Sequence, residues 1–226
     1  MPPSIKLTYF DIEGVAEPVR LALALGGIAY EDERIEFSQW AEIKHKTPHG
    51  KLPVMIIDGG RARTESGAML RYVASLVPEK KLVCPDKIYE IEEAIGLIDD
   101  MRQSFMPAHY MGMRPQNFGY PGDFLKTEEG KAKVEELRKN WIKNDLPTYL
   151  RHIESMIERN GGNWIASDDK PTIADCKAIV FLRMLVKGVV DYVDPNCLKS
   201  NANIVKYMEK FFTLPEIVGR YKDGFP

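Results

Sequence analysis

The chain has 226 residues, 44% of them hydrophobic and 28% charged, with a formal net charge of −2. This length and composition exclude a disordered or fibrous protein, and they allow one large domain or two smaller ones whose core needs no metal or disulfide. The slight excess of acidic residues argues against nucleic acid as a partner, because proteins that bind phosphates carry an excess of Lys and Arg.

Predicted strands and helices alternate in the N-terminal third of the chain. The strand segments are short and bounded by turn residues, whereas the helical segments carry apolar residues at a spacing of three or four. Their order is strand, helix, strand, helix, strand, strand, helix, at residues 5–10, 15–25, 30–37, 39–46, 50–58, 61–65 and 66–76. This order is typical of a thioredoxin-like α/β domain, which we expect over residues 1–78.

Residues that favour helix ends support these limits. Pro18 lies in the first turn of the first helix, and Gly26 and Gly27 follow its last apolar residue. Proline fits the first turn because its φ is already helical, and glycine fits the end because it adopts a left-handed conformation. Ser66 is expected to cap the last helix of this domain with its hydroxyl.

The rest of the chain has an almost entirely helical pattern. Apolar residues recur at helical spacing over 88–105, 131–159 and 173–190. Thr172, followed three residues later by Asp175, has the pattern of a capping box at the start of the last of these segments. The stretch VPEKKLVCPD at residues 77–86, which precedes the first of these helical segments, has the composition of a linker. We therefore expect an all-α C-terminal domain over residues 88–226.

The sequence favours a cytoplasmic protein. The stretch MPPSIKLTYFDIEG lacks the basic and apolar regions of a secretory signal. The most apolar long segment, 178–193, is interrupted by three charged residues, so we interpret it as a core helix and expect no membrane span. Three widely spaced cysteines, Cys84, Cys176 and Cys197, indicate neither a disulfide framework nor a zinc site.

The junction between the first strand and the first helix is where a thioredoxin-like domain commonly carries its reactive group, because a helix N-terminus stabilises an anion there. In this chain the junction is TYFDIEG, residues 8–14. It contains no cysteine, which disfavours a disulfide oxidoreductase. Its hydroxyl groups belong to Thr8 and Tyr9, although a tyrosine on a strand serves packing more often than catalysis.

The segments KLTYFDIEGVAEPVRLALALGGIAYEDERI, GKLPV and TESGAMLRYVA resemble the cytosolic glutathione transferase family, and GGNWIASDDKPTIAD resembles the capping segment of its helical domain. The sigma class, which is of the Tyr type, is the most similar. The resemblance implies that Tyr9 activates the thiol of glutathione, which is a co-substrate, and that no prosthetic group is present. It also implies a homodimer.

The resemblance further implies a glutathione site with four parts. One group of residues holds the glycine end, the backbone before a cis-proline meets the cysteinyl unit, a pair at a helix start binds the γ-glutamyl carboxylate, and an acid reaches the γ-glutamyl amine from the partner subunit. In that order, these residues are Trp40, Lys44 and Lys51, then Leu52 and Pro53, then Glu65 and Ser66, and finally Asp100.

The second substrate is expected to be a small apolar electrophile bound beside Tyr9. The stretch FMPAHYMGMRPQNFGYPGDF is rich in Met and aromatic residues, which suit an adaptable apolar surface. An equally weighted alternative is a loop packed on its own side chains. The residues expected to contact the electrophile are Phe10, Met106, Tyr110 and Met113.

Three positions depart from the sigma pattern. Val15 stands where those enzymes carry an arginine that supports thiolate formation, so Tyr9 is expected to have less electrostatic help. Glu65 replaces a glutamine, which puts a carboxylate beside the carboxylate of the ligand and is expected to weaken binding. His49 replaces an aromatic or apolar residue, so a more polar dimer contact is expected.

Alternatives to a transferase share the same scaffold. One is a protein that binds glutathione or another ligand, or serves as a structural protein, without catalysis, and another is a glutathione-dependent isomerase or peroxidase. A metal site at His45 and His49 is disfavoured, because Pro48 interrupts the helix between them and no third ligand is near.

Overall fold

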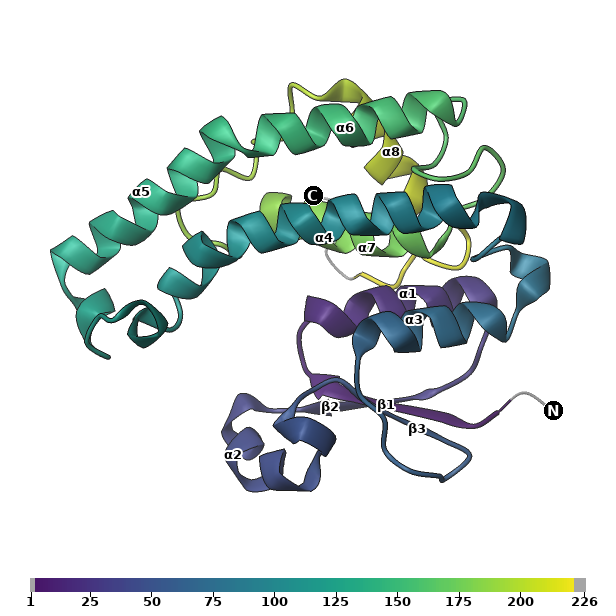
Figure 1. Cartoon of the computed structure of the whole chain (residues 1–226), viewed down its shortest axis with the longest axis horizontal. Helices are drawn as coiled ribbons and strands as arrows, with labels where there is room; N and C mark the ends of the chain where they lie inside the picture. The colour runs from purple at the N-terminus through teal and green to yellow at the C-terminus, as the bar shows by residue number, and fades with distance from the viewer. Residues whose placement is uncertain (1–2, 222–226) are drawn as a thin grey trace.

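The computed structural model describes residues 3–221. An α/β part with a small mixed sheet packs against an all-helical part, as predicted (Figure 1). The α/β part contains β1 (Ile5–Phe10), α1 (Glu17–Gly26), β2 (Glu31–Ile35), α2 (Trp40–Ile43), β3 (Val54–Ile57) and α3 (Ser66–Ser75). The helical part contains α4 (Ile88–Met111), α5 (Glu128–Asn144), α6 (Leu146–Arg159), α7 (Ile173–Val186) and α8 (Ala202–Phe212).

The described part of the sheet has three strands in the order β2-β1-β3, with β1 parallel to β2 and antiparallel to β3. Side chains of β1 alternate in burial, so that Ile5, Leu7 and Tyr9 face the core. The strand predicted over 61–65 is wrong, because only the single bridge between Met55 and Arg63 forms there. That segment has no apolar face to bury, and strands are held mainly by such packing.

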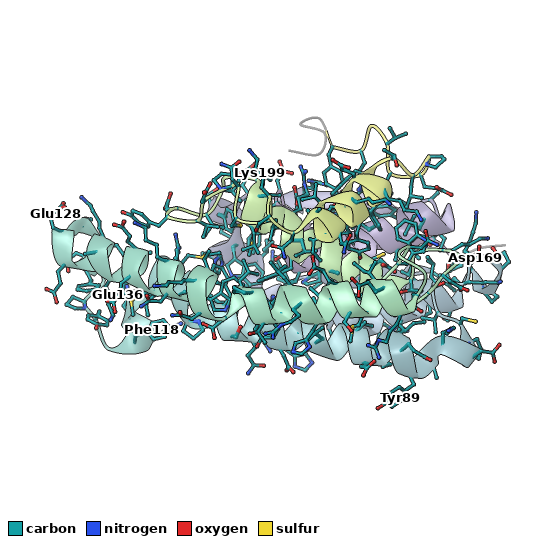
Figure 2. The ribbon with its side chains drawn as sticks, turned by 90° about the horizontal axis from the view of Figure 1, so that it is seen from above. Tyr89, Phe118, Glu128, Glu136, Asp169 and Lys199 are labelled. Carbon is teal, nitrogen blue, oxygen red and sulfur yellow. The ribbon has the colours of Figure 1, made fainter. Side chains whose placement is uncertain are left out.

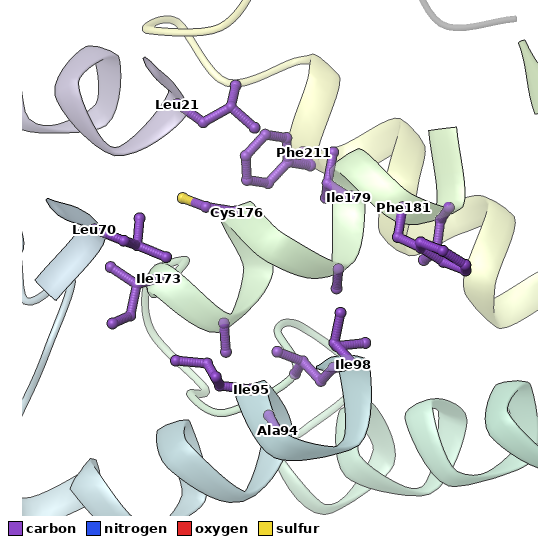
Figure 3. Close-up of a cluster of buried hydrophobic side chains, with 14 of the residues drawn as sticks. Leu21, Leu70, Ala94, Ile95, Ile98, Ile173, Cys176, Ile179, Phe181 and Phe211 are labelled. Atoms are coloured by element: carbon purple, nitrogen blue, oxygen red, sulfur yellow. The ribbon is translucent and has the colours of Figure 1, made fainter. Parts of the chain in front are cut away.

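Helices α1 and α3 cover one face of the sheet and separate it from the helical part (Figure 1). On their other side lies α7, whose residues meet side chains of α1, α3, α4 and α8 in one continuous core (Figure 3). Cys176 is fully buried in that core, near Leu21 and Phe211. The segment interpreted as a core helix is therefore confirmed as far as Val186, where α7 ends.

Two predicted helix signals are confirmed. Pro18 stands in the first turn of α1, and Gly27 ends the helix with φ 64°, its N–H donating to the carbonyl of Ala24. At α7 the capping box forms, with Thr172 N–H donating to Asp175 Oδ2 at 2.7 Å. The same carboxylate also accepts from Tyr207 Oη and from the backbone N–H of residue 165, which joins α7 to α8.

Two predicted helix limits need correction. The single helical run expected over 131–159 is two helices, because α5 ends at Asn144 and Pro147 stands in the first turn of α6. Proline lacks the N–H that a continuous helix needs and its ring collides with a carbonyl of the preceding turn. Ser66 is the first residue of α3 rather than its cap; Glu65 occupies the cap position and no side chain caps it.

Helix α4 continues six residues beyond the expected end at residue 105, to Met111, with Pro107 inside it. The turns that follow pack on their own side chains, since Tyr120 stacks on Phe124 with ring centroids 4.1 Å apart. Seen from above, Phe118 and the start of α5 at Glu128 project beyond the rest of the molecule (Figure 2). The Met-rich stretch is therefore divided between a helix face and a self-packed loop.

Candidate functional site

Tyr9 lies near the end of β1 on the face covered by helices, and its side chain is 8% exposed. Its hydroxyl oxygen accepts a hydrogen bond from the backbone N–H of Val15 at 3.4 Å. Burial raises the pKa of Tyr9, although the bond from Val15 opposes the shift. The phenol therefore keeps its proton at neutral pH, and because its oxygen already accepts from Val15, that proton is available to another acceptor.

The loop after Tyr9 fits the phenol closely because Gly14 has no side chain. A Cβ on Gly14 would lie 2.7 Å from the Tyr9 hydroxyl oxygen and 2.8 Å from a ring carbon. The glycine also has φ 49°, a left-handed conformation that residues with a side chain adopt at a cost. Its conformation brings the N–H of Val15 to the phenol.

Three further groups act on Tyr9 from the helices that cover it. The guanidinium carbon of Arg20 in α1 lies 5.8 Å from the centroid of the Tyr9 ring. Arg102 and Tyr110, both in α4, also affect the pKa of Tyr9, the arginines by lowering it and Tyr110 by raising it. Arg20 is itself fully buried and paired with Glu17 and Asp32. The positive charge predicted to be missing with Val15 is thus partly supplied by other elements.

The predicted cis-proline is confirmed, since the Leu52–Pro53 peptide bond is cis. In the antiparallel pairing of β1 with β3, Thr8 stands opposite Val54. Tyr9 follows Thr8 on β1, and Pro53 precedes Val54, the first residue of β3. The expected thiol activator and the cis-proline therefore each lie one residue beyond the last pair of β1 with β3, at the same end of that pairing.

Residues expected to hold the glycine end come from α2 and the turns after it. Trp40 begins α2 and packs edge to face on Phe10, with ring centroids 5.7 Å apart. Lys44 and Lys51 are exposed, and among residues 3–221 neither forms an ion pair. Lys44 lines a shallow hollow of about 330 Å³ together with Ala41, His45, Thr47 and Gly50. An exposed lysine that lines a hollow suits a carboxylate ligand.

The residues expected at the γ-glutamyl end are at the start of α3. Glu65 has φ 74° and ψ 95°, which is strained for a residue with a side chain and costs about 1–3 kcal/mol. Strained backbone conformations of this kind are common at functional sites. Ser66 follows as the first helical residue, where free N–H groups and the helix dipole favour an anion.

Asp100 is exposed on α4, and its carbonyl accepts a hydrogen bond from Tyr149 at 3.4 Å. Its neighbour Asp99 has a different role, since Lys177 of α7 binds both oxygens of that carboxylate at 2.5 and 2.6 Å. The two acids are thus distinguished by their contacts, and within residues 3–221 the carboxylate of Asp99, unlike that of Asp100, forms an ion pair.

The residues expected at the second substrate come from three segments, namely β1, helix α4 and the turn after α4. Met106 and Tyr110 lie four residues apart on α4 and therefore share a helix face, whereas Met113 follows the helix and is 54% exposed. Phe10 stacks on Phe37, with centroids 4.4 Å apart. The side chain of Phe10 is thus engaged with the α2 side of the site.

Sequence reasoning missed three residues near Tyr9, namely Glu13, Gly14 and Arg102. Arg102 precedes Met106 and Tyr110 on α4 by four and eight residues, so helical spacing was a signal that could have placed it on the same face. Gly14 carried no signal for its close approach to Tyr9. The partners of Glu13 lie more than 150 residues away in the sequence, at positions 183 and 187, which no local pattern indicates.

The described residues show neither a metal site nor a membrane span, and the second hollow lies away from Tyr9. A second hollow of about 350 Å³ lies between α5 and the loop after α7, and its lining residues do not include Tyr9 or its neighbours. Residues 3–221 contain no group of three metal-ligating side chains, and a turn separates His45 from His49. Within the same range no helix is long and apolar enough to cross a membrane.

Comparisons with known proteins agree with this geometry. The family model described as "Glutathione S-transferase, N-terminal domain" matches residues 5–75, and that described as "Glutathione S-transferase, C-terminal domain" matches residues 122–220. A Caenorhabditis elegans protein named "Glutathione S-transferase P" is 30% identical, over 95% of this chain and 90% of its own length. A Schistosoma japonicum protein named "Glutathione S-transferase class-mu 28 kDa isozyme" is 30% identical, over 76% of this chain and 75% of its own.

Among solved structures, prostaglandin synthase D of Nilaparvata lugens matches with a TM-score of 0.74 and 25% identity, over 95% of each chain. The three relatives carry three different class or activity names. They agree on the family and differ in the class within it. The chain belongs to the glutathione S-transferase family.

Proposed function

We propose that this chain is a sigma-like, Tyr-type glutathione transferase that activates the thiol of glutathione for attack on small apolar electrophiles. The observation that carries the proposal is the phenol of Tyr9, which is buried, keeps its proton, accepts from Val15 and lies at the same end of the β1–β3 pairing as cis-Pro53. A phenol in this state can donate a hydrogen bond to an anion. The relatives named as transferases support the reaction class.

The energy required is within reach of one phenol. A free thiol has a pKa of about 8.5, so half ionisation at pH 7 needs about 2 kcal/mol of thiolate stabilisation. A hydrogen bond to a charged group is worth about 1.5–3 kcal/mol. The Tyr9 hydroxyl would donate to the sulfur anion, and the thiolate would then attack the electrophilic carbon held next to it.

Residues 1–78 would form the glutathione domain and 88–226 the domain that supplies most of the second site. Lys44, Lys51 and Trp40 would hold the glycine end, Leu52 the cysteinyl unit, and Glu65 with Ser66 the γ-glutamyl carboxylate. Met106, Tyr110 and Met113, with Phe10, would contact the electrophile. We further propose a cytoplasmic homodimer in which Asp100 of one subunit completes the glutathione site of the other.

Other uses of this site are less well supported. The retained Tyr9 and the transferase names of the relatives do not favour a non-catalytic protein. An isomerase or peroxidase would use the same thiolate, and the one relative described as a prostaglandin synthase leaves that reaction as an outcome of substrate screening.

The test is the substitution Tyr9→Phe, assayed by conjugation of glutathione with chlorodinitrobenzene. We expect kcat/KM near neutral pH to fall roughly 100-fold, which is the usual cost of removing one donor to a reacting anion. Binding of S-methylglutathione should stay unchanged, because that ligand has no thiol to stabilise. A variant as fast as the wild-type protein would refute the role of Tyr9.

The pH profile provides a second check on the same proposal. Because burial raises the pKa of Tyr9 above its ordinary value of 10.0, the phenol stays protonated as the thiol ionises. The rate should therefore rise with pH and should show no descending limb until the pH exceeds 10. A decline near neutral pH would mean that Tyr9 loses its proton there, with a pKa that is lowered and not raised.

A further inference from the structure

The loop between β1 and α1 is tied to the helical part of the molecule through Glu13. Its carboxylate oxygen Oε1 accepts from Lys187 Nζ at 2.7 Å and from Arg183 Nε at 3.2 Å. Arg183 belongs to α7 and Lys187 follows its last turn, whereas Glu13 follows Tyr9 by four residues. The contact therefore joins the loop of the expected thiol activator to the central helix of the other part.

The cationic side of this contact is held in place independently of Glu13. Arg183 is 1% exposed, and its guanidinium carbon lies 4.4 Å from the ring centroid of Tyr221 and 5.4 Å from that of Phe212. A buried guanidinium between two aromatic rings has little freedom to move. Arg183 therefore keeps its position without help from Glu13, and the position of Glu13 is set by α7.

The backbone on both sides of Glu13 is also fixed. The carbonyl of Ile12 accepts from Arg20 at 2.9 Å, and the carbonyl of Glu13 accepts from the N–H of Glu17 at 3.1 Å. The chain then passes through Gly14 to Val15, whose N–H donates to the Tyr9 hydroxyl oxygen. Only two peptide units separate the Glu13 side chain from that hydrogen bond.

We propose that Glu13 is a positioning residue, through which α7 holds the loop so that the Val15 N–H stays on the Tyr9 oxygen and the phenol proton points to the sulfur of glutathione. The inference rests on the proposed function of Tyr9, and it adds that thiol activation by Tyr9 depends on a contact with the helical part. The contact between Arg71 of α3 and Glu92 of α4 also joins the two parts, but it does not involve this loop.

The experiment measures ionisation of bound glutathione directly. The thiolate is titrated by ultraviolet difference absorbance in the wild-type protein and in the variants Glu13→Gln and Lys187→Met. We expect the apparent pKa of the bound thiol to rise by about one unit in Glu13→Gln, which means about tenfold less thiolate at a pH below both values. The rise should be smaller in Lys187→Met, because the bond from Arg183 to Glu13 is kept. The charged groups that act on Tyr9 itself, Arg20 and Arg102, are unchanged in every variant.

The matched control is Lys177→Met. Lys177 is also a lysine of α7 that pairs with a carboxylate, Asp99, but this pair does not touch the Tyr9 loop. Lys177→Met should leave the thiol pKa unchanged. The double variant of Glu13 and Lys187 should resemble Glu13→Gln alone, because Glu13→Gln already removes the ion pair with Lys187. Binding of S-methylglutathione should be the same in all variants, which a general loss of structure would not allow.

The outcomes separate two kinds of failure. If the thiol pKa is the same in Glu13→Gln, Lys187→Met and wild-type protein, while Tyr9→Phe raises it, the positioning role is refuted and the function of Tyr9 stands. If Tyr9→Phe also leaves the thiol pKa unchanged, the proposed function and the role of Glu13 are both refuted. An equal rise in Lys177→Met would show a general effect of α7 and would overturn the assignment to Glu13.

Discussion

The two sides of the Tyr9 site are held in different ways. The loop over residues 11–16 is fixed by the partly buried ion pairs of Glu13, by Gly14 against the phenol and by the start of α1. The segment over residues 37–51 consists of short turns and the single short helix α2, and most of its side chains are exposed. Its contact with β1 is the packing of Phe37 and Trp40 on Phe10.

This difference indicates that the two segments have different roles, one in thiol activation and the other in ligand binding. Thiol activation depends on the position of one proton, so it benefits from a rigid loop, since small displacements of a reacting group cost large factors in rate. Binding of the charged ends of a tripeptide tolerates more movement, because exposed ion pairs depend weakly on geometry and contribute little individually. Substitutions in the loop should therefore affect turnover, and substitutions in the turns should affect affinity.

The largest effect is expected from Gly14→Ala. The added Cβ would meet the Tyr9 hydroxyl at 2.7 Å and displace the phenol, and a shift of that order lowers kcat roughly 100-fold. The control is Gly27→Ala, since Gly27 has φ 64° but nothing within 4 Å of the added atom. Steady-state kinetics of both variants give the answer, and equal losses would mean that backbone strain, and not the contact with Tyr9, is responsible.

An intermediate effect is expected from Lys44→Met and Lys51→Met. Each should raise KM for glutathione about two- to fivefold and leave kcat unchanged, because an exposed ion pair contributes about 0.2–1 kcal/mol. The effect should diminish at high salt. Lys46→Met is the control, since Lys46 is an exposed lysine in the same turn and has no expected ligand contact. A fall in kcat without a change in KM would contradict this difference in roles.

The smallest effect is expected from Glu65→Gln. Removing a negative charge near the ligand's carboxylate should lower the dissociation constant for glutathione about two- to fivefold, since charges near 4 Å apart in water interact by about 1 kcal/mol. Calorimetric titration at low and high salt measures this change. Weaker binding in the variant would show that the Glu65 carboxylate holds the ligand's amine.

Much of the fold was predictable because its signals are local. Pro18, Gly27 and the pair Thr172 and Asp175 mark helix limits through the chemistry of one turn, and the structure confirms them. The predicted cis bond at Pro53 is confirmed too, although it followed from resemblance and not from spacing. Errors arose where local patterns compete, as at Pro147, which stands in a helical pattern yet begins a new helix.

The site was less predictable, because its support comes from distant parts of the chain. The residue type and position of Tyr9 follow from the first strand, but its surroundings depend on Arg102 of α4, and those of Glu13 on Arg183 of α7. Such contacts are set by how the two parts pack, which periodicity does not encode. The predicted roles of Lys44, Lys51 and Asp100 depend on a bound ligand and stay predictions.

The burial of the protein's own thiols has a consequence for a protein that receives electrophiles. Cys176 is fully buried and desolvation raises its pKa well above the ordinary value, and burial raises the pKa of Cys197 to about 11. At pH 7 only about one Cys197 in 10⁴ is a thiolate. Against an activated glutathione Cys176 and Cys197 are poor competitors, so burial protects these two side chains from alkylation by the compounds that the protein is proposed to consume.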